Sequence, residues 1–203
     1  MNYPFEKSDI AFQNNRKLFC ELAKTDSPFD EDFPNRLPSI MAYDFDKIKE
    51  RACAYRSSQS KKLLYSADAL VILPSEASLD AGAKKIRYCF IEFKNQKVDN
   101  IQSVKDPDDN DLMMKAFDSL SVCALTFARG IPMVELQQKS MFIVVYPKQD
   151  YSEKILEVLN ELSAENGEVK PLWLLDKLEN AGFINKVLTI DDEQFRTLPF
   201  FTH

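Results

Sequence analysis

The order of apolar and polar positions along the first half of the chain predicts helices followed by strands. Apolar residues at helical spacing favour a helix over 7–24 and a second helix over about 44–58. Two later segments, 66–73 and 85–94, are rich in β-branched, aromatic and other apolar residues. They favour two strands joined by a long hairpin loop, the first of them ending at Pro74.

The second half of the chain continues the alternation. A broad apolar face predicts a helix over 111–129, which Gly130 then ends. Residues 141–146 are apolar without interruption, which is typical of a central strand with parallel neighbours. The remaining elements that we expect are two helices and a short edge strand, at 151–163, 171–180 and 186–190.

This order of elements predicts an α/β fold, because strands that alternate with helices form a sheet with helices packed on it. The 203 residues suffice for one well-packed domain, and no internal repeat or low-complexity segment divides them. We therefore expect a single-domain sandwich over 1–203, in which a central mixed β-sheet is flanked by helices.

The composition is that of a soluble globular protein and excludes several classes. Apolar residues make up 45% and charged residues 29% of the chain. No apolar run reaches the roughly 20 residues that a membrane helix needs. The first residues lack the pattern of a signal peptide, so we expect a cytoplasmic protein with no membrane partner.

Cysteine and histidine usage argues against two further kinds of site. The chain has four widely spaced cysteines, Cys20, Cys53, Cys89 and Cys123. Without a Cys-x-x-Cys pair, reduced and mostly buried thiols are favoured over a zinc site or a disulfide framework. His203 is the only histidine, so catalysis by a histidine base, alone or in a serine or cysteine triad, has little support.

The distribution of charge leaves nucleic-acid binding open. A net charge of −6 argues against a protein whose whole surface is basic. A local basic strip can still contact phosphates. One candidate strip surrounds the two predicted strands and consists of Lys61, Lys62, Lys84, Lys85, Arg87, Lys94 and Lys97. The alternative interpretation of these residues is a solvated charged face.

The strand predicted over 85–94 carries an acid and a lysine two residues apart, Glu92 and Lys94. Side chains alternate along a strand, so both point to one face of the sheet while Phe93 points to the other. Asp68 lies in the preceding predicted strand. Charged side chains on a buried face are costly unless they meet one another, a metal or a substrate. We therefore expect Asp68, Glu92 and Lys94 to converge.

An acid on one strand and an acid-x-lysine motif on the next, followed by a helix and a buried strand, is the layout of the PD-(D/E)xK nuclease superfamily. The chain resembles this superfamily over about 44–147. The resemblance implies a restriction-endonuclease-like core, on which the N-terminal and C-terminal helices pack. It also implies a Mg²⁺ or Mn²⁺ site with Asp68 and Glu92 as metal ligands and Lys94 as the catalytic lysine. The implied function is metal-dependent hydrolysis of phosphodiester bonds in nucleic acid, either DNA or RNA.

The sequence departs from the superfamily pattern in three places. Ala67 stands where the eponymous proline would be. Many members carry a glutamate on the first core helix, and here Glu50 and Glu21 are candidates that cannot be assigned. In the helix over 111–129, Lys115 is the residue available where some members have a glutamine- or lysine-rich signature.

Three functions therefore stay open. The acid-x-lysine triplet is too common to decide alone, since Glu168 and Lys170 form a second copy outside any predicted strand. The first hypothesis is a metal-dependent nuclease. The second is a catalytically inactive nuclease-like fold that serves as a protein-binding or immunity-type module, acting with a protein partner or as a homodimer. The third is an unrelated α/β protein. Convergence of the three side chains at an open cleft would favour the first, and a lost or blocked site the second.

Overall fold

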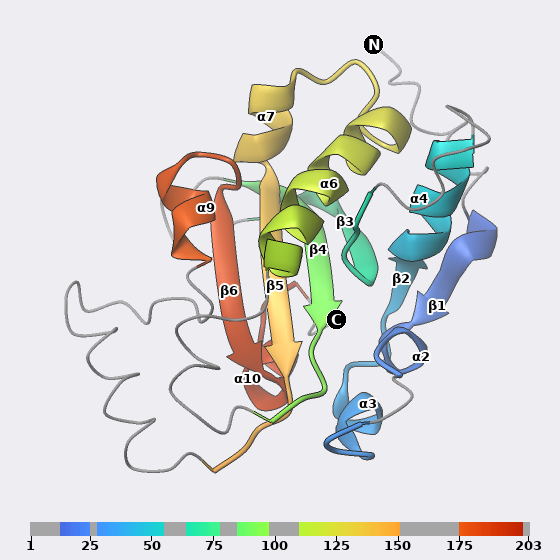
Figure 1. Ribbon diagram of the computed structural model, residues 1–203, viewed down its shortest axis with the longest axis vertical. Helices are drawn as coiled ribbons and strands as arrows, with labels where there is room; N and C mark the ends of the chain where they lie inside the picture. Colours follow the sequence, from blue (N-terminus) through green and yellow to red (C-terminus); the bar gives the residue numbers. More distant parts are fainter. Residues whose placement is uncertain are drawn as a thin grey trace.

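The computed structural model describes residues 13–24, 28–54, 64–77, 85–97, 110–150 and 175–200. A six-stranded mixed β-sheet runs through this part of the chain, with the strands side by side in sequence order (Figure 1). The strands are β1 (Arg16–Leu18), β2 (Met41–Asp44), β3 (Ala69–Ala77), β4 (Ile86–Phe93), β5 (Ser140–Tyr146) and β6 (Lys186–Asp191). The pairs from β1 to β4 are antiparallel, whereas β4, β5 and β6 are parallel to one another. The expectation of an α/β fold with a mixed sheet is confirmed.

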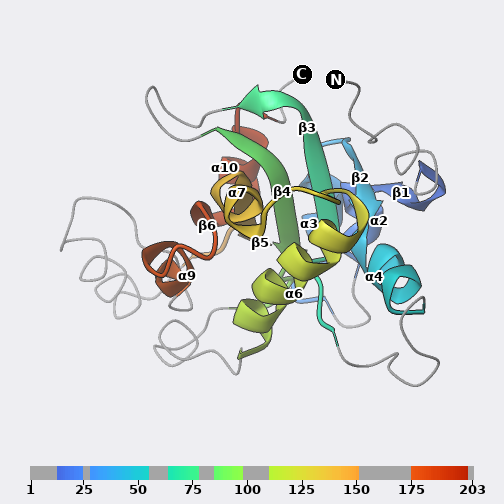
Figure 2. The same ribbon diagram turned by 90° about the horizontal axis from the view of Figure 1, so that it is seen from above.

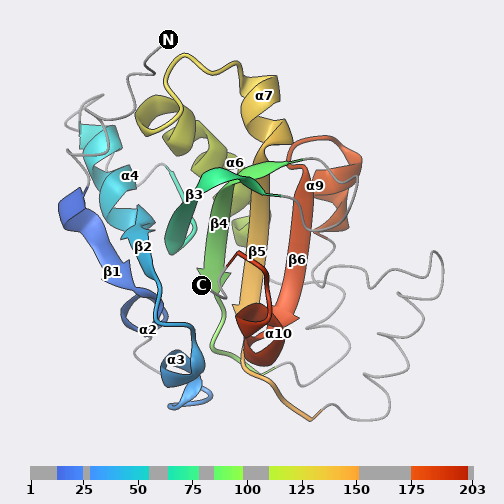
Figure 3. The same ribbon diagram turned by 180° about the vertical axis from the view of Figure 1, so that it is seen from behind.

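Helices cover both faces of the sheet. One face carries α4 (Phe45–Ala54), α6 (Asn110–Thr126), α7 (Met133–Gln138) and α9 (Asp176–Asn180), which lie in front of the sheet in Figure 1. The other face carries α2 (Phe19–Leu22), α3 (Phe33–Arg36) and α10 (Asp192–Arg196), which Figure 3 shows from behind. A short 3₁₀ helix, η1 (Gln13–Asn15), precedes β1. The view from above in Figure 2 separates the two helical layers.

The central strands supply side chains to two separate cores. In β4, Tyr88 and Phe90 pack under α4 and α6, whereas Cys89, Ile91 and Phe93 pack under α2, α3 and α10. The same alternation holds along β5, which is buried at every position. A strand buried on both faces needs apolar residues throughout, which explains the unbroken apolar run in its sequence. By this alternation Glu92 faces the layer that contains α6.

Several sequence predictions are confirmed. The strand expected at 85–94 is β4, and the run at 141–146 is β5, with parallel neighbours on both sides. The edge strand expected at 186–190 is β6, the last strand in the sheet order. The helix expected at 111–129 is α6, which ends at Thr126. The helix expected at 44–58 is α4, which the structure describes as far as Ala54.

The prediction of one helix over 7–24 is wrong from residue 13 onward. This segment forms η1, then β1, and only four residues of helix in α2. Backbone pairing of Arg16, Lys17 and Leu18 with β2 replaces the helical hydrogen bonds that the apolar spacing favoured. The Leu18 N–H then donates to Glu21 Oε2, which marks the true start of the helix. Residues 7–12 lie outside the described part.

The strand predicted at 66–73 is also corrected. β3 begins only at Ala69 and continues through Pro74 to Ala77. Its pairing with β4 becomes irregular between Ile72 and Ala77, and such an irregularity tolerates a proline, which has no N–H for the ladder. The sequence also did not predict β2, α3, α7 or α10, all of which are six residues or shorter. The helix expected at 151–163 lies outside the described residues, as does the first part of the one expected at 171–180.

None of the helices in the described ranges has both the length and the apolar character that crossing a bilayer requires.

Phe93 anchors the end of β4 at the centre of an aromatic cluster. Its ring lies 5.6 Å from Phe19, 6.5 Å from Phe33 and 6.3 Å from Phe195, measured between ring centroids. We expect Phe93→Ala to lower the free energy of unfolding by about 3–5 kcal/mol, because it leaves a large cavity in a packed core. Urea unfolding of the variant measures this. Phe29→Ala is the control, because Phe29 is 46% exposed and its loss should change the stability by no more than about 0.5 kcal/mol.

Candidate functional site

Glu92 is a carboxylate inside the core between β4 and α6. It is only 3% exposed. Its Oε1 accepts a hydrogen bond from the Lys115 ammonium at 2.6 Å, while its Oε2 is buried and has no hydrogen-bond partner among the described residues. A buried carboxylate oxygen normally has a partner, so the unpartnered Oε2 is an exception that needs an explanation.

Asp68 lies directly beside Glu92. The antiparallel register of β3 and β4 pairs Ala69 with Ile91. Asp68 precedes Ala69 and Glu92 follows Ile91, so the two acids lie across from each other. The Asp68 carboxylate accepts a hydrogen bond from the Phe93 N–H at 2.8 Å, and its carbonyl accepts one from the Phe45 N–H at 3.1 Å. The structure therefore brings the two predicted acids together on one face of the sheet.

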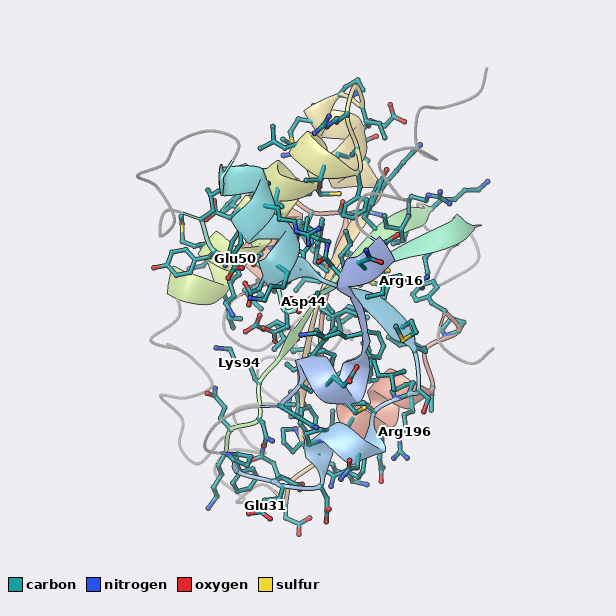
Figure 4. The ribbon with its side chains drawn as sticks, turned by 90° about the vertical axis from the view of Figure 1, so that its right-hand side faces the viewer. Arg16, Glu31, Asp44, Glu50, Lys94 and Arg196 are labelled. Atoms are coloured by element: carbon teal, nitrogen blue, oxygen red, sulfur yellow. The ribbon has the colours of Figure 1, made fainter. Side chains whose placement is uncertain are left out.

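Lys94 follows the last residue of β4. Its backbone N–H donates to the Val145 carbonyl at 2.8 Å, which fixes the end of the strand against β5. Figure 4 shows Lys94 at the end of the sheet, below Asp44 and the beginning of α4. Burial has the largest influence on the pKa values of Asp68 and Glu92, and Lys94 is among the cations that lower them. All three predicted residues thus belong to one electrostatic group.

The cation that contacts Glu92 is Lys115, on α6. This lysine was noted in the sequence only as the residue available on that helix. Its side chain is 22% exposed. Burial would lower the pKa of Lys115, but the charges of Glu92 and Asp68 outweigh burial and raise it above its usual value, so the side chain is an ammonium.

Asp46, in the first turn of α4, is a carboxylate of the site that the sequence analysis missed. It accepts hydrogen bonds from Lys49 and from the Ser66 hydroxyl. Burial would raise the pKa of Asp46, but these two hydrogen bonds and the charge of Lys115 lower it. Its negative charge also raises the pKa of Asp68. The sequence contained one signal for Asp46, which is an acid in the first turn of a helix. Using this signal would have required the prediction of β2, because β2 places that helix start beside the other acids.

The two glutamates considered for this role have other partners. Glu50 pairs with Lys47 at 3.1 Å and its side chain is 58% exposed. Glu21 accepts the Leu18 N–H at the start of α2. Figure 4 shows Glu50 above Asp44 and Lys94.

The two central carboxyls hold protons more tightly than ordinary carboxyls do. Burial raises the pKa of Asp68 to about 6, although Lys115 and the Phe93 N–H oppose this shift. Burial and the charge of Asp68 raise the pKa of Glu92 to about 8, although Lys115 opposes it. Two acids in one poorly hydrated place therefore compete for a single ammonium.

A cleft of about 350 Å³ lies beside this group, between α2 and α4. Asp46 and Asp68 belong to its wall, whereas Glu92 and Lys94 are not among the described residues that line it. The lysines of the cleft are each paired with an acid, as Lys17–Asp44 at 2.7 Å, Lys47–Glu50 at 3.1 Å and Lys49–Asp46 at 2.7 Å. Their charges are therefore largely compensated within the protein.

A larger cleft of about 680 Å³ lies where β4, β5 and β6 end. It contains Asp192, which is fully buried. One Asp192 oxygen accepts from Arg36 Nε and the other from the Lys148 N–H, both at 2.7 Å. Both oxygens of Asp192 therefore have partners, and its ion pair with Arg36 is a structural one. Asp192 has no oxygen left for a metal, so we do not assign the candidate site to this cleft.

Four residues of the basic strip expected around the two predicted strands lie in the described part of the chain. Lys61, Lys62 and Lys84 lie outside the described residues. Lys85 and Arg87 lie at the beginning of β4, whereas Lys94 and Lys97 follow its end. The Arg87 guanidinium donates to the Leu73 carbonyl and so holds β3 against β4.

The donor set suits a hard divalent cation. Mg²⁺ in proteins uses one or two carboxylates and completes its shell with water and substrate phosphates. Asp68 and Glu92 supply two such carboxylates, and no partner for Glu92 Oε2 lies in the part of the chain that the structure describes. In the described part of the chain, no three acid, cysteine or histidine side chains form a group that could hold a metal ion. Within the described residues, a cation here would take its side-chain ligands from Asp68 and Glu92.

The raised pKa of Glu92 makes stability depend on pH. The folded protein binds this proton more tightly than the unfolded chain, where the usual pKa is 4.5. The contribution of Glu92 to stability is therefore fully present below about 4.5 and is lost as the pH rises through about 8. The slope for one proton is at most about 1.4 kcal/mol per pH unit. We expect thermal unfolding between these values to show the decline in the wild type, a smaller decline in Glu92→Gln, and no change of slope in the exposed control Glu50→Gln.

A wild type and a Glu92→Gln variant with the same slope would contradict this assignment of the titrating group.

No family model, curated protein or solved structure matches the chain.

Proposed function

We propose that the chain is a metal-dependent phosphodiester hydrolase, a nuclease of the PD-(D/E)xK type with a restriction-endonuclease-like core. The observation that carries this proposal is the position of Asp68, just before β3, across from Glu92 on β4, with Glu92 Oε2 buried and without a partner among the described residues. The resemblance over about 44–147 supports it further, because the acid and the acid-x-lysine motif fall at neighbouring positions of the sheet. The substrate class is nucleic acid, DNA or RNA.

The roles of the residues follow from their positions. Asp68 and Glu92 would hold Mg²⁺ or Mn²⁺, which supplies charge neutralisation and an activated water. The Phe93 N–H orients the Asp68 carboxylate, and β4 fixes the Glu92 side chain between two layers. Lys94, which follows β4, would hold the attacking water and offset negative charge on the phosphate.

A second candidate is the inactive nuclease-like fold that binds a protein. Two observations favour it. Lys115 already contacts Glu92, and the lysines that line the 350 Å³ cleft are paired with acids rather than open to phosphates. Exposed Met133 and Val134 on α7 give such a module an apolar surface. The two candidates differ in whether metal binds and whether Lys94 is needed for cleavage.

Metal binding is the first test. We expect calorimetry to detect Mg²⁺ or Mn²⁺ binding to the wild type and a loss of most of the affinity in Asp68→Asn and in Glu92→Gln, because each removes one of two protein ligands. Glu50→Gln is the matched control, since Glu50 lines the cleft but pairs with Lys47. Equal binding by the wild type and both site variants would place the metal elsewhere.

Cleavage is the second test. We expect Lys94→Ala to reduce metal-dependent cleavage of a DNA and RNA panel by at least about 100-fold, the usual range for a group that assists proton transfer. Its stability should change by no more than about 0.5 kcal/mol, because Lys94 follows the strand and leaves no core cavity. Lys97→Ala, at an exposed position three residues on, is the control.

If Lys94→Ala instead lowers the melting temperature strongly and the wild type cleaves nothing with any metal, Lys94 is a structural partner of the acids. That result would favour the protein-binding module.

A further inference from the structure

The site already contains a cation that belongs to the chain. The Lys115 ammonium lies 2.6 Å from Glu92 Oε1, and the charges of Glu92, Asp68 and Asp46 all act on it. It therefore lies among the carboxylates where the proposed metal would bind. Two cations within contact distance of the same carboxylate repel each other strongly in a poorly hydrated site.

We propose that Lys115 is the resident counter-ion of this site, which a divalent cation must displace from Glu92, so that Lys115 sets the affinity for metal. The inference rests on the proposed function in taking Asp68 and Glu92 as the metal ligands. It adds a regulatory property: the site is closed by an internal ammonium until a metal competes successfully for the carboxylates.

A comparison with the other deeply buried ion pair shows why the Glu92 pair is not simply structural. Asp192 has a partner on each of its oxygens, Arg36 on one and the Lys148 N–H on the other. Glu92 is also buried, but among the described residues only its Oε1 has a partner. A structural carboxylate in a core is expected to be fully satisfied. The unpartnered Oε2 therefore marks a ligand position that the ammonium alone does not fill.

The Lys115 side chain is able to move away from Glu92. It is 22% exposed, whereas Glu92 is 3% exposed, so the lysine reaches the acid from the solvent side of the pair. The aliphatic part of a lysine is flexible, and its ammonium gains hydration when it moves outward. A displaced Lys115 stays attached to α6 beside the site. Metal binding then needs no movement of β4 or α6.

The test measures the affinity of the full chain for Mg²⁺ by calorimetry, in the same buffer for the wild type and the variants. We expect Lys115→Met to bind Mg²⁺ tighter than the wild type, on the order of tenfold, which is typical for the coupling between two ligands of one site. Methionine keeps the length of the side chain and removes the competing charge. Lys139→Met is the matched control, because Lys139 pairs with Glu135 at 2.8 Å on another helix and should leave the affinity unchanged.

The outcomes separate this inference from the proposed function. Tighter Mg²⁺ binding by Lys115→Met than by the wild type supports the inference. If Lys115→Met binds Mg²⁺ and the wild type binds none, the inference is supported, but the proposed enzyme is overturned in favour of the inactive module. Equal or weaker binding by Lys115→Met overturns the inference and leaves the metal-dependent function in place. Absence of binding by both proteins overturns both.

A measurement on the wild type covers the case in which Lys115→Met does not fold. In a crystal structure with Mn²⁺ bound, we expect Lys115 Nζ to lie beyond hydrogen-bonding distance of Glu92. Mn²⁺ bound to Glu92 with the Lys115 contact still at about 2.6 Å would overturn the inference.

Discussion

The contact between Glu92 and Lys115 is the interaction on which the rest of the site depends. β4 is buried on both faces, so its side chains enter one of two cores, and at position 92 the sequence places a carboxylate in one of them. Such a group is tolerated only if an opposite charge reaches it. α6 supplies that charge, and the pairing leaves one oxygen of Glu92 without a partner. The chemistry available to the site follows from this incomplete neutralisation.

The alternation of side chains along β4 links stability to the site. Phe93 enters the aromatic core with Phe19 and Phe195, while Glu92 and Lys94 belong to the side of the acids. The Phe93 N–H also orients the Asp68 carboxylate. Phe93, the middle residue of the acid-x-lysine motif, therefore fixes the end of β4 in the core and also orients Asp68.

The sequence predicted those parts of the structure that depend on local periodicity. The period of two placed Glu92 and Lys94 on one face, and unbroken apolarity identified β5 as a central strand. Asp46 and the role of Lys115 were not predictable in the same way, because each reaches the site through the packing of a helix on the sheet. β1 and β2 were missed for a related reason: strands of three and four residues carry too few positions for a pattern, and pairing with neighbours decides their conformation.

The sequential order of the strands has a consequence for the way in which charge enters the core. Asp68 and Phe93 are 25 residues apart and meet within an antiparallel strand pair, while Glu92 and Lys115 are 23 residues apart and meet through the crossover from β4 to β5. The helix of that crossover is the element that covers Glu92. It also carries the ammonium. The packing of this one helix therefore both removes Glu92 from water and brings its counter-charge into contact with it.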